Sequence, residues 1–234
     1  ALEHYRSCGL DVSRILYSDK PSGIALITVD SLAENSIVVA SGANADITPE
    51  DIDASADIIR SAGMLLLQLE IPMPAVVRAA EIAHECGVKV VLNPAPATKL
   101  PEELLRCVSI LIPNETEASA ISGIDITDLK TAGKAANLLK SKGVREIIIT
   151  MGSRGTVVCD GETSFIPARK VNAVDTTAAG DTFCGGVCVA LSEGKDIYDA
   201  VRFATVASSI AVQRPGAQDS VPSRQEVDYI MNNN

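Results

Sequence analysis

The sequence contains no tryptophan, and aromatic residues make up only 3% of it. Its core must therefore be built from aliphatic side chains, and a hydrophobic fraction of 47% supplies enough of them. A chain of 234 residues can bury roughly 70% of the surface that it exposes when unfolded. A core made of alanine, valine, isoleucine and leucine, with few aromatic rings, favours helices layered on a buried sheet. The composition therefore indicates an α/β fold class.

Positive charge is also scarce. The 30 acidic residues outnumber the 20 basic ones, which gives a net charge of −10, and the basic residues form no run. Such a chain repels polyanions, so we expect neither nucleic acid nor an anionic membrane as a partner. No segment approaches the roughly 18 apolar residues of a membrane-spanning helix, and the first residues lack a signal-peptide core. We therefore expect a cytoplasmic protein.

Several functional signatures are missing as well. The six cysteines include no Cys-x-x-Cys pair, and only two histidines are available to complete a cysteine metal site. We expect buried free thiols and assign no metal to them. The sequence also lacks Gly-x-Gly-x-x-Gly and a Walker A loop. These absences argue against a dinucleotide-binding dehydrogenase and against a P-loop enzyme.

The sequence does contain an alternation of strand and helix patterns. Continuous apolar runs at 64–70, 88–92, 108–112 and 146–151 alternate with helical patterns at 49–61, 74–86, 101–106, 115–122 and 128–142. This order predicts a mainly parallel sheet with helices on both faces. A hairpin at 156–166 and helices at 179–193, 197–212 and from Ser223 follow. Polar residues close the strands at Glu70, Asn93, Asn114 and Gly152, where such sheets bind ligands.

Before this alternation, two β-rich runs at 23–30 and 35–40 flank a turn-like segment at 31–34 and predict a hairpin. We expect this hairpin to form a small β lid over residues 22–42, while residues 1–21 and 43–234 form the α/β domain. A two-stranded ribbon is marginally stable by itself. We therefore expect the lid to pair with the lid of a second subunit in a homodimer.

The chain is organised around residues 174–186. Ala178, Ala179 and Gly180 carry almost no side chain, and an apolar run with helical spacing follows them directly. This pattern predicts a loop that turns into a helix. A ligand can come close to the bare N–H groups of the first turn, where the helix dipole is positive. The three small residues therefore form a candidate anion hole.

Asp181, in the same first turn, has two interpretations. An aspartate at this position can simply complement the helix dipole. Beside an anion hole, the carboxylate can instead take a proton from a hydroxyl group while the amides stabilise the charge of a transferring group. The small residues favour this second interpretation, which is a phosphoryl-transfer site built without a Walker lysine.

The segment Asp175-Thr-Thr-Ala-Ala-Gly-Asp181-Thr-Phe resembles the second signature of the phosphofructokinase-B type family of sugar and nucleoside kinases. Its Ala-Ala form is nearer the ribose-phosphorylating branch than the Gly-Ala form common elsewhere in the family. Segments 93–97, 113–118, 150–155 and 216–222 follow that branch in order and spacing. The resemblance is continuous from about residue 22 to residue 225.

The resemblance implies a mainly parallel α/β sheet with a small β lid, and an activity that uses ATP, Mg²⁺ and a monovalent cation, usually K⁺. The reaction would transfer the γ-phosphate of ATP to a sugar hydroxyl, converting D-ribose to D-ribose 5-phosphate. By resemblance, Asp181 would be the general base, and Ala178, Ala179 and Gly180 would hold the γ-phosphate.

The remaining roles come only from the resemblance. Asn114 and Glu117 would act near the triphosphate and its Mg²⁺, with Glu117 reaching the metal through water. Glu70 would contact the sugar. The nucleotide loop would be shaped by Thr150, Gly152 and Gly155, and the monovalent cation would be held by oxygens of Asp175, Thr177, Ala211, Arg214, Gly216 and Ser220.

The residues alone leave alternatives open at three of these positions. Asn114 is equally suited to cap the following helix without touching a ligand. Glu70 ends a predicted buried strand, where its carboxylate needs a polar partner, either a sugar or a structural arginine. Ser220 precedes Val-Pro and equally suits a turn hydroxyl.

The sequence departs from the family pattern in two ways. The family begins with a strand, a sugar-binding glycine-rich region and the first lid strands, and none of these precedes Ala1. We therefore expect a fold that is incomplete at its N-terminus and a truncated chain that phosphorylates sugar poorly. Cys184 stands where the motif often has Asn, and the region near Ala204 lacks an obvious polar residue to read adenine. Alternative functions are another sugar or nucleoside kinase of the family, or a non-catalytic nucleotide-binding fragment.

Overall fold

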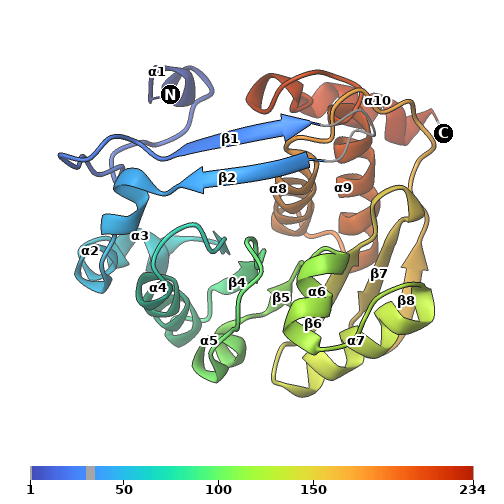
Figure 1. Ribbon diagram of the computed structural model, residues 1–234, viewed down its shortest axis with the longest axis horizontal. Coiled ribbons are helices and arrows are strands. Elements are labelled where there is room, and N and C mark those ends of the chain that lie inside the picture. Colours follow the sequence, from blue (N-terminus) through green and yellow to red (C-terminus); the bar gives the residue numbers. More distant parts are fainter. Residues whose placement is uncertain (1, 30–34, 234) are drawn as a thin grey trace.

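The computed structural model describes residues 2–29 and 35–233, with the side chains of the first two strands described up to residue 26 and from residue 38. The chain forms a two-stranded antiparallel sheet and a separate six-stranded sheet surrounded by helices (Figure 1). Among the described residues, no helix combines the length and the apolarity that crossing a membrane would require.

The six-stranded sheet has its strands in chain order, β3-β4-β5-β6-β7-β8. The first four are parallel, and the last two are antiparallel to their neighbours. The strands are β3 (Met64–Leu67), β4 (Lys89–Leu92), β5 (Ile110–Leu111), β6 (Glu146–Thr150), β7 (Thr156–Cys159) and β8 (Thr163–Ile166). The expected mainly parallel sheet is confirmed, although the strand predicted at 108–112 is limited to Ile110 and Leu111.

Alternate residues of the strands enter two different cores. Val90 and Leu92 of β4 pack in the core on the side of α4 and α7, whereas Val91 between them packs in the core beneath α8 and α9. The period of two residues in a strand produces this division, and it explains why the sheet needs helices on both faces. The helices are α4 (Met73–Glu85), α5 (Glu102–Cys107), α6 (Glu115–Ser122), α7 (Leu129–Ser141), α8 (Ala179–Ser192), α9 (Ile197–Ala211) and α10 (Arg224–Asn232).

The single helix predicted at 49–61 is wrong, because the chain forms α2 (Pro49–Asp53) and α3 (Ala56–Ser61) with a break between them. The N-terminal segment contacts this break. Arg14 donates at 3.1 Å to the carbonyl oxygen of Ala54, which in a continuous helix would accept the N–H of Ile58. The N–H of Ile58 donates to Ser55 instead, at 3.2 Å. A contact across 40 residues of sequence lies beyond any local pattern.

The helices α8 and α9 pack with an unusually close approach of their backbones. A Cβ atom added at Gly186 would lie 2.9 Å from the Cα atom of Ala204, so only glycine fits at this crossing. Since α8 begins at the candidate anion hole and α9 follows it after a short loop, this crossing fixes one helix against the other.

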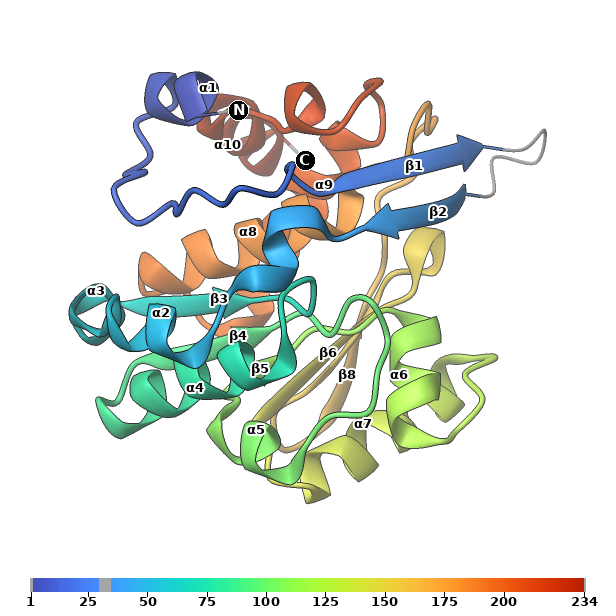
Figure 2. The same cartoon turned by 60° about the vertical axis from the view of Figure 1, so that its left-hand side comes forward.

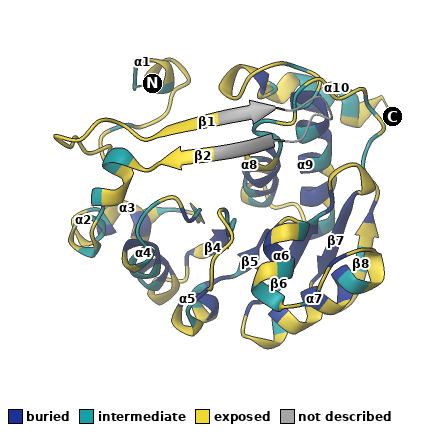
Figure 3. Cartoon of the chain, viewed as in Figure 1, coloured by how far each residue is buried: buried dark blue, intermediate teal, exposed yellow. Residues whose placement is uncertain are grey.

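The predicted lid hairpin is confirmed as β1 (Ile24–Val29) paired with β2 (Asn35–Ala40), in a register that runs from Ile24 opposite Ala40 to Val29 opposite Asn35. The turn expected at 31–34 lies outside the described residues. The ribbon is separate from the central sheet and forms a layer of its own beside α8 (Figure 2). Its described residues are exposed, in contrast to the buried central strands (Figure 3). A short helix, α1 (Leu2–Ser7), precedes it, and 3-10 turns lie at Gly42–Asp46, Gly152–Arg154 and Gln218–Ser220.

Candidate active site

Two cavities open beyond the carboxyl ends of the parallel strands. The first, here called the lid cavity, has a volume of about 920 Å³ and lies between the lid strands, the segments after β3 and β4, and residues 176–181. The second, here called the α9 cavity, has a volume of about 690 Å³ and lies between the loop after β6, residues 168–173 and one face of α9. Four residues line both cavities: Asn114, Thr150, Thr176 and Gly180.

The start of α8 lies at the junction of the two cavities. Ala178 is the N-cap residue, and its φ of 58° and ψ of 12° place it in the left-handed region that L-residues avoid. A Cβ atom added at Gly180 would meet no other atom within 4 Å, so the first turn is open to a ligand. The N–H of Ala179 donates to Thr176 at 3.2 Å, so an anion there depends mainly on the amides that follow in the first turn.

Asp181 is exposed and lines the lid cavity, in the first turn of α8 and directly after Gly180. Its carboxylate is therefore accessible from the side that holds the lid, while the preceding glycine reaches both cavities. A hydroxyl group in the lid cavity and an anion at the α8 N-terminus would meet at this junction. The arrangement suits transfer of a group between two ligands, with a carboxylate beside the accepting one.

Asp175 joins the loop before α8 to the loop after α9. Its carboxylate accepts the N–H of Thr177 and the N–H of Gly216, each at 2.9 Å. Hydrogen bonding to the Thr177 side chain, and then to these two N–H groups, lowers the pKa of Asp175. The N–H groups of Val174 and Asp175 also donate to Val212, at 2.7 and 3.2 Å. The structure thus brings together the two segments that the sequence predicted to share a monovalent cation.

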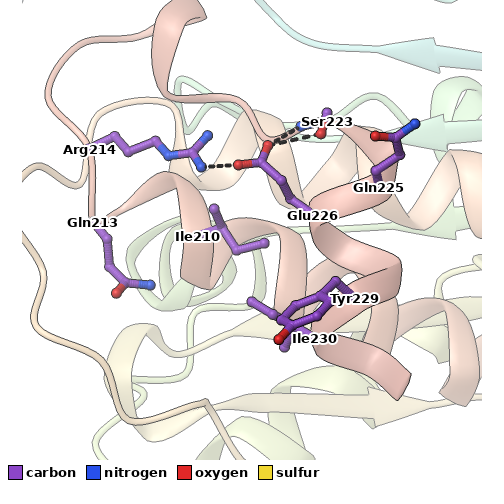
Figure 4. Close-up of a pocket in the computed structure, with 8 residues that line it drawn as sticks. All are labelled: Ile210, Gln213, Arg214, Ser223, Gln225, Glu226, Tyr229 and Ile230. Carbon is purple, nitrogen blue, oxygen red and sulfur yellow. Dashed lines mark hydrogen bonds and ion pairs between the residues drawn. The ribbon is translucent and has the colours of Figure 1, made fainter. Parts of the chain in front are cut away.

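The other residues of that predicted cation set lie in or beside the loop after α9. The carbonyl oxygen of Ala211 accepts the N–H of Arg214 at 3.0 Å. Ser220 is completely buried, and its hydroxyl donates to the carbonyl oxygen of Ala217 at 2.7 Å, a hydrogen bond that fits its interpretation as a turn hydroxyl. The side chain of Arg214 pairs with Glu226 of α10, beside a further cavity of about 520 Å³ (Figure 4). Among the described residues, no group of three or more His, Cys, Asp or Glu side chains is placed to hold a metal ion.

Asn114 caps α6, as one of its two interpretations predicted, and it also lines both cavities. Its side-chain oxygen accepts the N–H of Glu117 at 2.8 Å, while both oxygens of the Glu117 carboxylate accept N–H groups of Asn114 at 2.9 Å. Glu117 is only 8% exposed, and burial raises its pKa. One hydrogen bond to each carboxylate oxygen fixes the orientation of Glu117, which also lines the lid cavity.

The predicted nucleotide loop after β6 has a conformation that depends on glycine. Gly152 and Gly155 have φ values of 54° and 119°, and a Cβ atom at Gly155 would lie 2.3 Å from the carbonyl oxygen of Ile166. Arg154 holds the loop from outside, since it donates to Thr127 at 2.7 Å and pairs with Glu115 of α6. Thr150, which ends β6, forms a bridge with Asn114 and so links the loop to the start of α6.

Glu70 lines the lid cavity, but the expectation that it ends a buried strand is wrong. The strand β3 ends at Leu67, and Glu70 is exposed three residues later. The chain leaves the sheet there, because the N–H of Leu69 donates to Ala95 rather than continuing the ladder. No arginine pairs with Glu70 among the described residues. Its carboxylate therefore carries no burial penalty and is accessible from the cavity.

Cys184 also lines the lid cavity, one turn after Asp181. Burial raises the pKa of its thiol to about 12 and that of Cys188 to about 11. Both thiols are therefore neutral at physiological pH, and neither is activated as a nucleophile.

Sequence reasoning missed several residues of the α9 cavity. Arg169 and Lys170 line it, between β8 and the loop that precedes α8. The sequence did offer one signal for them, since two adjacent basic residues stand shortly before the loop of small residues at 178–180. The region near Ala204 does contain polar groups, contrary to expectation, because Thr205, Ser208 and Ser209 line the same cavity from α9.

The chain matches the profile of the pfkB family carbohydrate kinases over residues 1–224. It is 43% identical over 232 residues to a ribokinase of Staphylococcus aureus, an alignment that covers 98% of this chain and 76% of the relative. The crystal structure of a ribokinase from Thermotoga maritima superposes with a TM-score of 0.89 at 38% identity, covering 99% of this chain and 76% of that one. An Arabidopsis thaliana ribokinase complexed with ribose and ATP gives a TM-score of 0.85 at 34% identity, covering 92% and 71%.

Proposed function

Because the chain belongs to the pfkB family of carbohydrate kinases, we propose that it transfers the γ-phosphoryl group of ATP to D-ribose, giving D-ribose 5-phosphate and ADP. The observation that carries this proposal is the meeting of two cavities at the start of α8. The sugar would occupy the lid cavity and the nucleotide the α9 cavity, with its γ-phosphate at the junction. The structure of a similar protein is complexed with ribose and ATP, which supports two small-molecule substrates.

Asp181 would accept the proton of the sugar hydroxyl, because its exposed carboxylate lines the cavity that would hold the sugar. The hydroxyl oxygen would then form a bond to the γ-phosphorus while the bond to the bridging oxygen of ADP breaks. Charge on the transferring group would be stabilised by the open first turn of α8, formed by Ala178, Ala179 and Gly180. The proton remains on the carboxylate until it is lost to solvent.

The nucleotide would be held by Asn114, Thr150, Gly152 and Gly155, of which the first two line both cavities. Bound Mg²⁺ would supply charge neutralisation at the phosphates. The carboxylate of Glu117, held in place by Asn114, would reach the metal through water. The nucleotide's own phosphates would supply most of the oxygen ligands that Mg²⁺ prefers.

The loops before α8 and after α9 fit a monovalent cation, which we propose is K⁺. Asp175 bridges the two loops, because its carboxylate accepts N–H groups from Thr177 and Gly216. The residues proposed to hold the cation are Asp175, Thr177, Ala211, Arg214, Gly216 and Ser220. A cation there would neutralise the negative charge of the oxygens of these residues. It would thereby stabilise the loop that leads into the anion hole.

The lid at residues 22–42 would cover the sugar against the α/β body, and Glu70 would contact the sugar from beneath it. The lid exposes four apolar side chains, Ile24, Leu26, Val38 and Val39, of which Leu26 and Val38 pair on one face and do not line the lid cavity. This apolar surface supports pairing of two lids in a homodimer. Since ATP is an intracellular substrate, we place the protein in the cytoplasm.

The proposal is tested by incubating the chain with ATP, Mg²⁺ and K⁺ and a panel of sugars and nucleosides, and measuring ADP release and the phosphorylated product. We expect D-ribose to be phosphorylated in preference to fructose and adenosine. Binding of ATP without transfer to any member of the panel would contradict the enzymatic proposal and favour a nucleotide-binding role. Transfer to a nucleoside in preference to ribose would contradict the substrate.

A further inference from the structure

Glu226 of α10 joins the two ends of the loop that connects α9 to α10 (Figure 4). One oxygen of its carboxylate, Oε1, pairs with the guanidinium of Arg214, shortly after α9 ends. The other oxygen, Oε2, accepts the N–H of Ser223 at 2.8 Å and the hydroxyl of Ser223 at 3.0 Å. One side chain therefore holds both ends of residues 214–223, a segment here called the α9–α10 loop.

The α9–α10 loop contains three of the residues that we propose for the monovalent cation, namely Arg214, Gly216 and Ser220. An arginine side chain has no hydrogen-bond acceptor, so Arg214 can offer a cation only its carbonyl oxygen. Its guanidinium is left for the ion pair with Glu226. The ion pair thus acts on a residue whose main chain belongs to the proposed cation site.

Hydrogen bonds, more than burial, fix the position of this loop. Residues 215–219 are exposed and pack in neither of the two cores. The N–H of Gly216 donates to the carboxylate of Asp175 at 2.9 Å, and the side chain of Gln218 donates to the hydroxyl of Tyr5 at 3.2 Å. Both of these hydrogen bonds are exposed to solvent. The contacts that Glu226 makes at the two ends are therefore a large part of what holds the loop.

A cation that is bound by several oxygens needs them at fixed separations. Hydrogen bonds to the residues that supply the ligands hold those separations, and their loss weakens metal binding even though the ligands themselves are unchanged. Glu226 makes such bonds on both sides of Gly216 and Ser220. Its carboxylate is thus placed to control the spacing of the oxygens in the loop.

We propose that Glu226 is a positioning residue for the monovalent cation, acting by holding both ends of the α9–α10 loop. It acts through Arg214 and Ser223 and is not itself a member of the proposed ligand set. This inference rests on the proposed function. It goes beyond the proposed ligand set by naming the residue behind the ligands that sets the affinity for K⁺.

The test measures K⁺ binding to the full chain by thermal unfolding at increasing KCl, with choline chloride added to keep the ionic strength constant. A ligand that binds only the folded protein stabilises it by an amount that depends on its concentration relative to Kd, so the rise in Tm reports the Kd for K⁺. Each variant is compared with its own Tm in choline chloride. A purely structural role of Glu226 would lower that Tm without changing the dependence on K⁺.

Glu226→Gln leaves one acceptor oxygen in place of two, so the side chain can hold only one end of the loop. The Kd for K⁺ should rise about two- to fivefold, which is the effect that one partly exposed ion pair can supply. The parent should show a rise in Tm with KCl, and Glu226→Gln should need a correspondingly higher KCl concentration for the same rise.

Glu226→Asp separates the positioning role from the charge and from the helix cap. An aspartate at the same position of α2, Asp51, accepts the N–H of its N-cap residue Thr48 at 2.9 Å, so aspartate can still cap α10. A side chain that is shorter by one methylene group should not reach Arg214. We therefore expect Glu226→Asp to weaken K⁺ binding as Glu226→Gln does, with a smaller fall of Tm in choline chloride.

Asp228→Asn is the matched control. Asp228 lies on the same helix and pairs with Arg224, and its side chain is 45% exposed, compared with 42% for Glu226. The substitution removes the same charge, but Arg224 is the first residue of α10 and lies outside the α9–α10 loop. Asp228→Asn should therefore bind K⁺ as the parent does.

The remaining outcomes separate this inference from the proposals beneath it. A Kd for K⁺ that is unchanged in Glu226→Gln or Glu226→Asp, or an equal loss of affinity in Asp228→Asn, would overturn the positioning role while leaving the cation site intact. A parent whose Tm rises no more in KCl than in choline chloride would overturn the cation site and this inference together. The kinase proposal is tested separately, by ADP release with ribose.

Discussion

Asn114 and Glu117 hold each other by three hydrogen bonds of 2.8 to 2.9 Å at the start of α6. Each residue caps the backbone of the other, and the pair lies where the two cavities meet. The same atoms therefore stabilise a helix end and define the shape of the site. Separating these two contributions requires a variant that loses the cap without touching a cavity.

Asn114→Ala should lower the free energy of unfolding by about 1–3 kcal/mol, because it removes an N-cap and leaves the buried carboxylate of Glu117 with fewer donors. It should also weaken nucleotide binding. Asp128→Ala is the matched control, since Asp128 caps α7 through a 2.7 Å bond to Thr131 and lines neither cavity. Urea unfolding and calorimetry on both variants make the comparison. Equal nucleotide affinity in the two variants would limit Asn114 to capping.

Asp181→Asn should reduce kcat by roughly 10²–10⁴ while changing ATP affinity by a few-fold at most, because the amide no longer accepts a proton. Asp199 provides the comparison, as it occupies the first turn of α9 and lies outside both cavities. If the carboxylate of Asp181 only complements the helix dipole, Asp181→Asn and Asp199→Asn will have equally small effects on turnover. Steady-state kinetics with ribose and ATP distinguish these outcomes.

The sequence predicted the order of strands and helices because each element carries its own periodicity. It also predicted the cluster at the start of α8, since small residues followed by a helical pattern have few other interpretations. It failed where a distant partner decides the structure. The helix expected at 49–61 is broken where Arg14 contacts Ala54, and Arg169 lies in the α9 cavity through the return of the chain from β8. The first contact leaves no local signal, and the second leaves only the adjacent basic pair Arg169-Lys170.

Ala178→Gly should raise the free energy of unfolding by about 1 kcal/mol, because Ala178 is held in the left-handed region at a φ of 58° and glycine adopts that region without steric cost. Ala179→Gly changes the next residue, which is helical. That substitution should lower stability by roughly 0.5–1 kcal/mol. Denaturant unfolding of the two variants should therefore show opposite signs, and stabilisation of neither would argue against strain at the N-cap.

Glu226 should make the stability of the protein depend on pH in the acidic range. Hydrogen bonds from Arg214 and then from Ser223 lower the pKa of Glu226 to about 2, from an ordinary value of 4.5 (Figure 4). When folding lowers the pKa of a carboxyl group, its full stabilising effect is present at every pH above the pKa of the group in the unfolded chain. This contribution is lost as the pH falls from about 4.5 to about 2. The difference in stability between the parent and Glu226→Gln should shrink across that window, as measured by urea unfolding at several pH values. A difference in stability that stays constant across this pH range would contradict the prediction.

The crossing of α8 and α9 at Gly186 has a consequence for redesign of the enzyme. One of these helices presents Asp181 to the lid cavity, and the other forms the wall behind Thr205 and Ser209. The backbones of the two helices are already in contact at Gly186 and Ala204. A shift of α9 would therefore also move α8 and its Asp181 carboxylate. A larger ligand in the α9 cavity must therefore be accommodated by trimming side chains, because displacing the helix would also move Asp181, which we propose as the proton acceptor.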